Sequence, residues 1–235
     1  PLDDTGGTDR GAVYLFRGVG TDFSGLTWQN KFASGTGADS MPTLANNDHF
    51  GSSIALDGNR LAVGAPAEVA GATGNGAVYL LNGLGDNIFA WRKTLASGTG
   101  AANMPALTNG DAFGWSVALD GDLMAIGARQ DSTGGVSRGA VHLFTGVGAD
   151  FSGLTWQKKI ASGTGTTATP VLSDSDSFGL SIALDGDRLA VGAVSDATGG
   201  TNRGAVHLFR GVGTDFSGLT WQNKLASGTG ATGMP

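Results

Sequence analysis

The chain has 235 residues, a formal net charge of −6, 42 glycines and no cysteine. An acidic chain without a basic patch is a poor ligand for nucleic acids or anionic membranes, and the absence of cysteine excludes disulfides and thiolate metal sites. No apolar run approaches the ~20 residues that a membrane-spanning helix needs. We find no signal peptide within these residues, so secretion would depend on a segment outside them.

In chain order, the sequence consists of units that repeat. Gly-Ala-Val, then Tyr or His, then Leu, begins at residues 11, 76, 139 and 204, and a tryptophan follows at 28, 91, 156 and 221. The first 42 residues contain only this second part of the unit. Each later unit opens with a further stretch, which covers residues 50–65, 113–128 and 178–193. We therefore divide the chain into a half unit, 1–42, and three full units, 43–105, 106–170 and 171–235, called the first to fourth repeats below.

The opening stretch of each full repeat predicts a β-hairpin. In the fourth repeat, Ile182 and Leu184 alternate with small residues, Asp185-Gly186 interrupts, and Leu189 and Val191 alternate again. Asp-Gly between alternating apolar runs is typical of a two-residue hairpin, and it favours a type I′ turn with positive φ at both central residues.

Each full repeat predicts four antiparallel strands. In the fourth repeat we place them near 179–184, 188–193, 204–209 and 219–226. Four strands in about 64 residues are typical of a β-propeller blade, which needs neighbouring blades to bury its faces. The predicted fold class is all-β, with three and a half blades forming one repeat domain. A stacked β-solenoid is the alternative, although its coils are usually shorter.

The motifs resemble a known family. Phe-Gly-x-Ser-(Ile/Val)-Ala-Leu-Asp-Gly, then Leu-Ala-Val-Gly-Ala, then Gly-Ala-Val-(Tyr/His)-Leu, is similar to the FG-GAP repeat of integrin-α-type propellers. The resemblance implies an extracellular or cell-surface protein. The family often carries a calcium loop between the first two strands, but here the connection is only Asp-Gly, which is too short to surround a calcium ion. The resemblance is therefore to the variety without that loop.

The half repeat predicts an incomplete ring. The first repeat supplies a third and a fourth strand without the preceding hairpin, and such an edge pairs with any available strand. We expect the partners to be identical subunits or neighbouring repeats of the same polypeptide, so that the 235 residues are one subunit of an assembly or an excerpt of a longer array.

Catalysis is not expected. Two of the three histidines, His142 and His207, occupy the position held by Tyr14 and Tyr79 in the other repeats, which favours an aromatic packing site over a metal ligand. His49 stands alone beside Phe50, and no nucleophile, base and acid share a fixed spacing. No cofactor is predicted, except that calcium is an open alternative.

Acidic residues recur in the loops. Two positions are acidic in several repeats; the candidates are Asp4, Asp131 and Asp196 at one, and Asp48, Asp111 and Asp176 at the other. They are candidate calcium ligands. The favoured interpretation is that each carboxylate accepts hydrogen bonds from nearby backbone amides and forms a turn.

The repeated tryptophans give a second candidate site. Trp28, Trp91, Trp156 and Trp221 are candidate platforms for stacking a sugar ring, although packing between blades is the favoured interpretation. The sequence thus predicts a non-enzymatic, extracellular, structural or adhesive repeat protein that associates with itself or continues as an array. The alternative is a lectin-like propeller that binds a glycan, with or without calcium.

Overall fold

The structure, a computed structural model, describes residues 2–18, 25–68, 74–85 and 88–232, and in these it contains strands but no helix. The first repeat contributes β1 (Val13–Arg17) and β2 (Thr27–Phe32), which form a two-stranded sheet. The other strands are β3 (Ser53–Asp57), β4 (Arg60–Ala65), β5 (Ala77–Gly85), β6 (Ile88–Leu95), β7 (Phe113–Asp120), β8 (Leu123–Ala128), β9 (Ala140–Thr145), β10 (Thr155–Ile160), β11 (Phe178–Asp185), β12 (Arg188–Ala193), β13 (Ala205–Arg210) and β14 (Thr220–Ala226).

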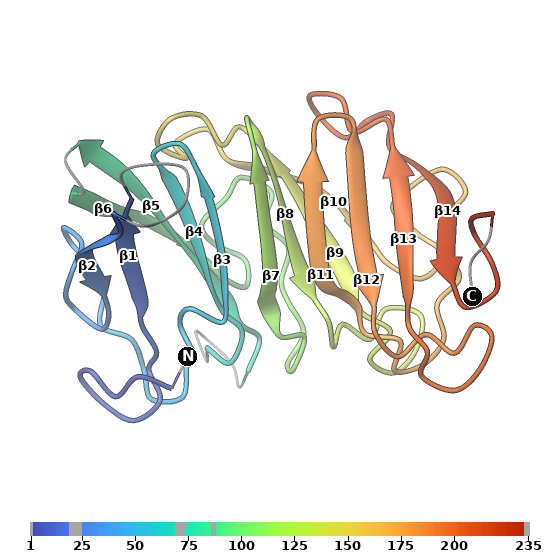
Figure 1. Cartoon of the computed structure of the whole chain (residues 1–235), viewed down its shortest axis with the longest axis horizontal. Coiled ribbons are helices and arrows are strands. Elements are labelled where there is room, and N and C mark those ends of the chain that lie inside the picture. The colour runs from blue at the N-terminus through green and yellow to red at the C-terminus, as the bar shows by residue number, and fades with distance from the viewer. Residues whose placement is uncertain (1, 19–24, 69–73, 86–87, 233–235) are drawn as a thin grey trace.

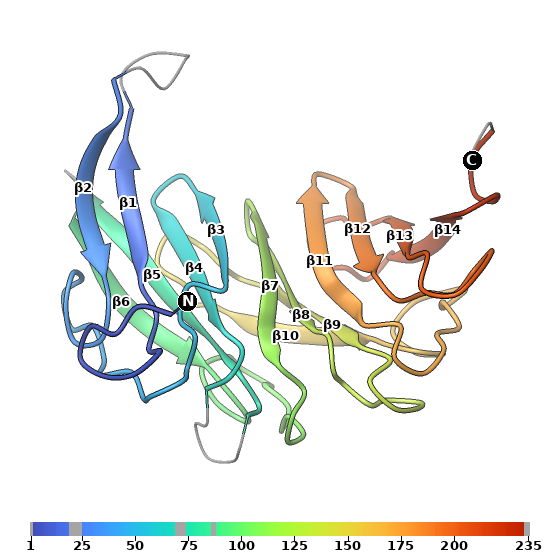
Figure 2. The ribbon, with the colours of Figure 1, turned by 60° about the horizontal axis from the view of Figure 1, so that its bottom comes forward.

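Each full repeat forms one antiparallel sheet with its strands in sequence order: β3 to β6, β7 to β10, and β11 to β14. The sheets stand side by side like the blades of a fan, with the first strands β3, β7 and β11 adjacent along one side (Figures 1 and 2). This is the predicted propeller-type arrangement, and the half repeat and three full repeats appear as two plus twelve strands.

The hairpin turns differ in detail from the sequence prediction. Asp57 pairs with Arg60, so the central residues are Gly58 and Asn59 rather than Asp and Gly. Only the glycine has a positive φ, 57°, and the turns at Gly121 and Gly186 follow the same rule. The predicted type I′ turn is therefore wrong, because it needs positive φ at both central residues. Glycine at the first position is the signature of type II′.

Neighbouring blades are joined through their glycines. Gly64 and Gly127, near the ends of β4 and β8, lie against the carbonyls of Gly114 and Gly179 of the next blade, where a Cβ would come within about 2 Å of the oxygen. The hydroxyl of Ser53 donates to that same Gly114 carbonyl at 2.8 Å. This close approach explains why the repeated motifs keep glycine at both places.

The hydrophobic core is divided among the spaces between blades. In each space, the phenylalanine of a Phe-Gly motif is fully buried. Its ring meets, edge to face, the ring of the aromatic residue on the third strand of the same repeat. Between the second and third repeats, Phe113 and Met124 pack with Val78 and Leu80 of the preceding blade. Each blade is thus stabilised chiefly by its neighbour, as in other repeat proteins.

Candidate functional site

In every repeat, an aromatic residue of the third strand lies opposite a polar residue at the equivalent position of the fourth strand. The register pairs are Tyr14 with Lys31, Tyr79 with Thr94, His142 with Lys159, and His207 with Lys224. A carboxylate from the segment before the third strand of each repeat contacts each pair. We call this group of aromatic residue, fourth-strand residue and carboxylate the loop carboxylate site.

In three repeats the fourth-strand residue is a lysine that forms an ion pair with the carboxylate. The distance is 3.0 Å for Lys159 Nζ to Asp131 Oδ2, 3.2 Å for Lys224 to Asp196, and 2.8 Å for Lys31 to Asp3. Each ammonium also donates to a threonine two residues beyond the aspartate, at 2.6 Å. In the first repeat the aspartate at this site is Asp3 and not the predicted Asp4, which instead accepts a hydrogen bond from the backbone of Asp9.

The second repeat has a different composition at this site. Glu68 replaces the aspartate, Thr94 replaces the lysine, and the Tyr79 hydroxyl is hydrogen-bonded to the Glu68 carboxylate. Burial, and secondly the charge of Asp48, raise the pKa of Glu68 to about 7. A carboxylate with no ammonium beside it therefore gains a proton more readily than those of the other repeats.

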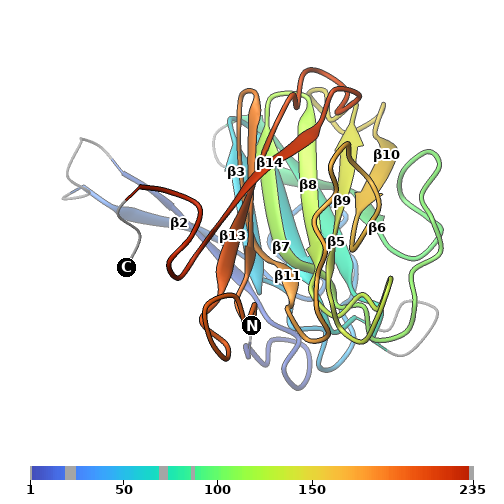
Figure 3. The same cartoon turned by 90° about the vertical axis from the view of Figure 1, so that its right-hand side faces the viewer.

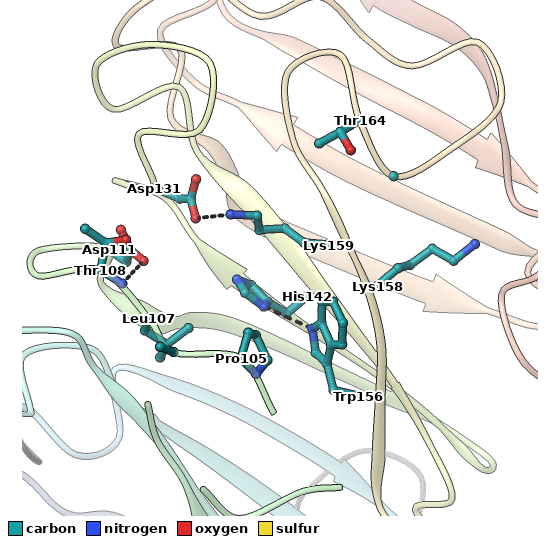
Figure 4. A pocket seen from close by; sticks show the side chains of 12 residues that line it. Pro105, Leu107, Thr108, Asp111, Asp131, His142, Trp156, Lys158, Lys159 and Thr164 are labelled. Carbon is teal, nitrogen blue, oxygen red and sulfur yellow. Dashed lines mark hydrogen bonds and ion pairs between the residues drawn. The ribbon is translucent and has the colours of Figure 1, made fainter. Parts of the chain in front are cut away.

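In the third repeat the site opens into a pocket of about 370 Å³. The pocket brings together three candidate site residues of the sequence analysis, Asp111, Asp131 and Trp156, with His142 and Lys159 (Figure 4). The connection that leaves the preceding blade, residues 105–108, closes one wall. All of the lining residues except Pro105 therefore belong to the third repeat.

Burial controls the electrostatics of this pocket. His142 is 2% exposed, its Nδ1 accepts a hydrogen bond from Trp156 Nε1 at 3.3 Å, and its Nε2 is buried without a partner among the described residues. Burial lowers the pKa of His142 to about 4 and raises that of Asp111 to about 6. Burial also acts to raise the pKa of Asp131, but hydrogen bonds from Thr133 and Lys159 outweigh it, so the net shift is downward. At neutral pH, His142 is uncharged and Asp131 is ionised.

The aspartates before each Phe-Gly act as turn formers. The Oδ2 atoms of Asp48, Asp111 and Asp176 accept hydrogen bonds from the backbone amides three residues earlier, at 2.6, 2.7 and 2.7 Å. Asp131 and Asp196 accept from the amides two residues later, at 2.8 Å each. These are the backbone contacts that the turn interpretation predicts. The described residues contain no group of three or more His, Asp or Glu side chains placed to hold a metal ion.

The four tryptophans lie on the outer strands β2, β6, β10 and β14. Trp91, Trp156 and Trp221 are partly buried and pack against the three core clusters. Trp28 belongs to the half blade and is 61% exposed. The packing interpretation therefore describes three of them, and sugar binding by any of the four stays a prediction.

The fold and these sites define a propeller-type repeat protein. The model of the FG-GAP repeat matches residues 44–81, 107–144 and 171–209, which are the first three strands of each full repeat. The chain belongs to the FG-GAP repeat family, as the resemblance predicted. FG-GAP repeats are found in extracellular, adhesion-type propeller proteins, and the family is generally non-enzymatic. Comparison with curated proteins gives no match. Among the described residues there is no helix of the length and hydropathy that crossing a membrane requires.

Proposed function

We propose that the chain is a non-enzymatic, extracellular structural or adhesive module that associates with identical subunits or further repeats through its open ends. The observation that carries this proposal is an apolar groove at the N-terminal end, beside the half blade. The groove has a volume of about 520 Å³ and lies between β1 and the β3–β4 hairpin.

The groove exposes side chains whose counterparts in the spaces between full blades are buried or partly buried. Ile54 and Leu56 of β3 are 50% and 56% exposed, and Phe16 of β1 is 53% exposed. The corresponding Phe144 and Phe209 are fully buried. Among the described strands, β1 pairs only with β2, so its other edge offers free backbone groups. Exposed apolar surface next to an unpaired strand edge favours association with another strand.

The C-terminal end offers a complementary surface. Ser116 of the third repeat donates to the Gly179 carbonyl of the next blade at 2.7 Å, whereas the corresponding Ser181 is exposed. The nearest atoms to Gly192 all belong to Ser181, although Gly64 and Gly127 each lie against a following blade. Figure 3 looks onto this end, with β13 and β14 nearest the viewer.

Both ends therefore fit one kind of partner, the hairpin that opens an FG-GAP repeat. Its second strand would pair with the free edge of β1, and its first strand would cover Ile54 and Leu56. The equivalent hairpin of a following repeat would cover β11. A partner of this kind would come from the same polypeptide or from another copy.

The test adds the hairpin to the chain. A second copy of residues 43–65 is fused directly before Pro1, because Pro1 corresponds to Pro66 in the repeat. Sedimentation velocity and electron microscopy at two dilutions then compare the oligomeric state with that of the original chain. We expect the original chain to associate and the extended chain to associate less and to unfold at a higher temperature.

The control is the same extension with the copies of Leu61 and Val63 changed to aspartate, which removes the apolar face that β4 buries. It should leave the association of the original chain unchanged. A sharp monomer at every concentration, unaffected by either extension, would contradict the proposal.

Carbohydrate binding is a second candidate, favoured by the pocket of the third repeat. Saccharide sites combine an aromatic face with a few convergent polar groups, and here Trp156 lies beside Asp131, Lys159 and Thr164. A glycan screen, followed by calorimetry with the best hit, tests it. Trp156→Ala should abolish binding, while Trp28→Ala, on the half blade, should not. Equal binding by both variants would refute this site.

A further inference from the structure

The second repeat lacks an internal cation that the other three repeats possess. Lys31, Lys159 and Lys224 each hold an ammonium group 2.8–3.2 Å from a loop carboxylate. At the same register position the second repeat has Thr94, opposite Tyr79. The threonine that completes each lysine site, such as Thr133, is replaced by Ala70 in the sequence.

One oxygen atom of each of two carboxylates at this place has no hydrogen-bond partner among the described residues. Glu68 Oε2 and Asp48 Oδ1 are both buried, and neither has a hydrogen-bond donor among the described residues. Asp48 itself is 1% exposed, and its charge acts on Glu68. The corresponding carboxyl oxygens in the third and fourth repeats are absent from this unpartnered group. Burying a carboxylate oxygen without a hydrogen-bond donor costs free energy, so we expect another positively charged group to interact with it.

We propose that a calcium-class divalent cation binds in the second repeat, between Glu68 and Asp48, in the place that a lysine ammonium takes in the other repeats. The hydroxyl oxygen of Tyr79 lies at the same site, since Tyr79 bonds to Glu68, and Thr94 is the register partner of Tyr79. Thr94 Oγ1 already accepts a hydrogen bond from Trp91 Nε1 at 3.3 Å, which orients it.

The choice of cation follows from the chemistry of the ligand atoms. Carboxylate and hydroxyl oxygens are hard ligands that suit calcium, whereas transition metals favour imidazole or thiolate, which none of the proposed ligand residues carries. Two carboxylates call for two positive charges, although Arg10 and His49 also act favourably on ionised Asp48. With two protein carboxylates and the remaining positions left to water, we expect a Kd in the range of about 10⁻⁴–10⁻³ M. This site is separate from the hairpin turn at Gly58, and it does not depend on the proposed association.

The test uses terbium, a luminescent substitute for calcium that nearby aromatic rings sensitise. Tyr79 contacts the site through Glu68, and Trp91 contacts Thr94, so terbium bound there should luminesce on excitation of the aromatic residues. We expect saturable luminescence that calcium displaces, and a higher melting temperature in calcium than in a chelator.

The decisive variant gives the second repeat the lysine of the other repeats. Thr94→Lys rebuilds the ammonium of the other repeats and should abolish both the luminescence and the effect of calcium on melting. Glu68→Gln should weaken both, while Thr94→Ser, which keeps the hydroxyl, should retain them. Lys93→Thr, one residue away, controls for terbium bound elsewhere and should behave as the original chain does.

Two results would overturn the proposal. One is a chain whose melting does not respond to calcium and which shows no displaceable luminescence. The other is a Thr94→Lys variant that folds and retains both signals, because the cation would then lie elsewhere.

Discussion

The second and third repeats have the same backbone but compensate their buried charges differently. In both, a buried phenylalanine meets the third-strand ring at 5.3 Å, for Phe50 with Tyr79 and for Phe113 with His142. In the third repeat, Lys159 pairs with Asp131, and Arg138 pairs with Asp174. In the second repeat the two cationic positions are occupied by Thr94 and Asn75.

The two repeats share their apolar packing and glycine contacts, and they differ in their charged residues. Because the packing and the glycine contacts are kept in both repeats, the blade forms with either set of charged residues. Where the lysine and the arginine are absent, a buried oxygen of each of Asp48, Glu68 and Asn75 has no hydrogen-bond donor among the described residues. We therefore predict larger effects from substitutions in the shared packing than from substitutions of the charged residues that differ.

The largest effect should come from the ring that both repeats share. Phe50 and Phe113 are fully buried, so Phe50→Ala and Phe113→Ala should each lower the free energy of unfolding by about 3–5 kcal/mol. Urea denaturation measures the loss. A large loss from one substitution and almost none from the other would show that the two repeats do not share a framework.

Removing the lysine of the third repeat should cost less. Lys159→Thr gives the third repeat the residue of the second and leaves Asp131, which is 3% exposed, without its ammonium. We expect a loss of about 2–3 kcal/mol, because a buried carboxylate without its partner keeps its desolvation cost. Lys158→Thr is the matched control. It removes a hydrogen bond to the Phe216 carbonyl, at a cost of about 1 kcal/mol or less. It also removes a charge that acts on exposed Asp215. Equal losses would show that the ion pair adds nothing.

The histidine of the third repeat should make stability depend on pH. His142 has its pKa lowered to about 4 from 6.5, so the folded state binds fewer protons than the unfolded state between these values. Its contribution to stability is therefore present above pH 6.5 and is lost as the pH falls towards 4. Asp131, Lys159 and Trp156 face it in the pocket.

His142→Tyr removes this titration and recreates the first repeat, where Tyr14 donates to Asp3 at 2.9 Å beside Lys31. On lowering the pH from 7.5 to about 5.5, the variant should lose about 1 kcal/mol less stability than the original chain. Thermal melting across this range measures it. An identical pH dependence in the two proteins would show that His142 does not titrate in this way.

The sequence was sufficient to predict the blades because their signals are local and repeated. Alternating apolar residues and fixed glycines predicted four strands per repeat, and the structure places the strands of the fourth repeat within a residue or two of the expected limits. The turn type was missed because the pairing of Asp57 with Arg60 shifts the turn by one residue. The strand register determines that shift, and the Asp-Gly pair alone does not reveal it.

The candidate site was predicted only in part. The repeated aspartates and tryptophans were identified, but Lys159 and Lys224 were not, since surface lysines are common and nothing in the sequence marks them as partners of a loop on another strand. Counting from Pro1, which corresponds to Pro66, would have given Asp3 instead of Asp4. Trp115 stands where the second and fourth repeats have Ser52 and Leu180, and the Arg129 guanidinium stacks on its ring at 3.7 Å.

The smallest effect should come from Arg138, the second cationic residue that the second repeat lacks. Arg138→Asn gives the third repeat the residue that the second has, and it removes the 2.8 Å ion pair with Asp174. Asp174 is 57% exposed, so water and salt already screen the pair and its loss should cost about 0.5 kcal/mol or less. Melting at low salt and at about 1 M salt should show this small difference shrinking further, because screening shortens the range of exposed charges. A loss as large as that of Lys159→Thr would mean that exposure does not set the strength of these pairs, and the exchange of cations between repeats would then need a different explanation.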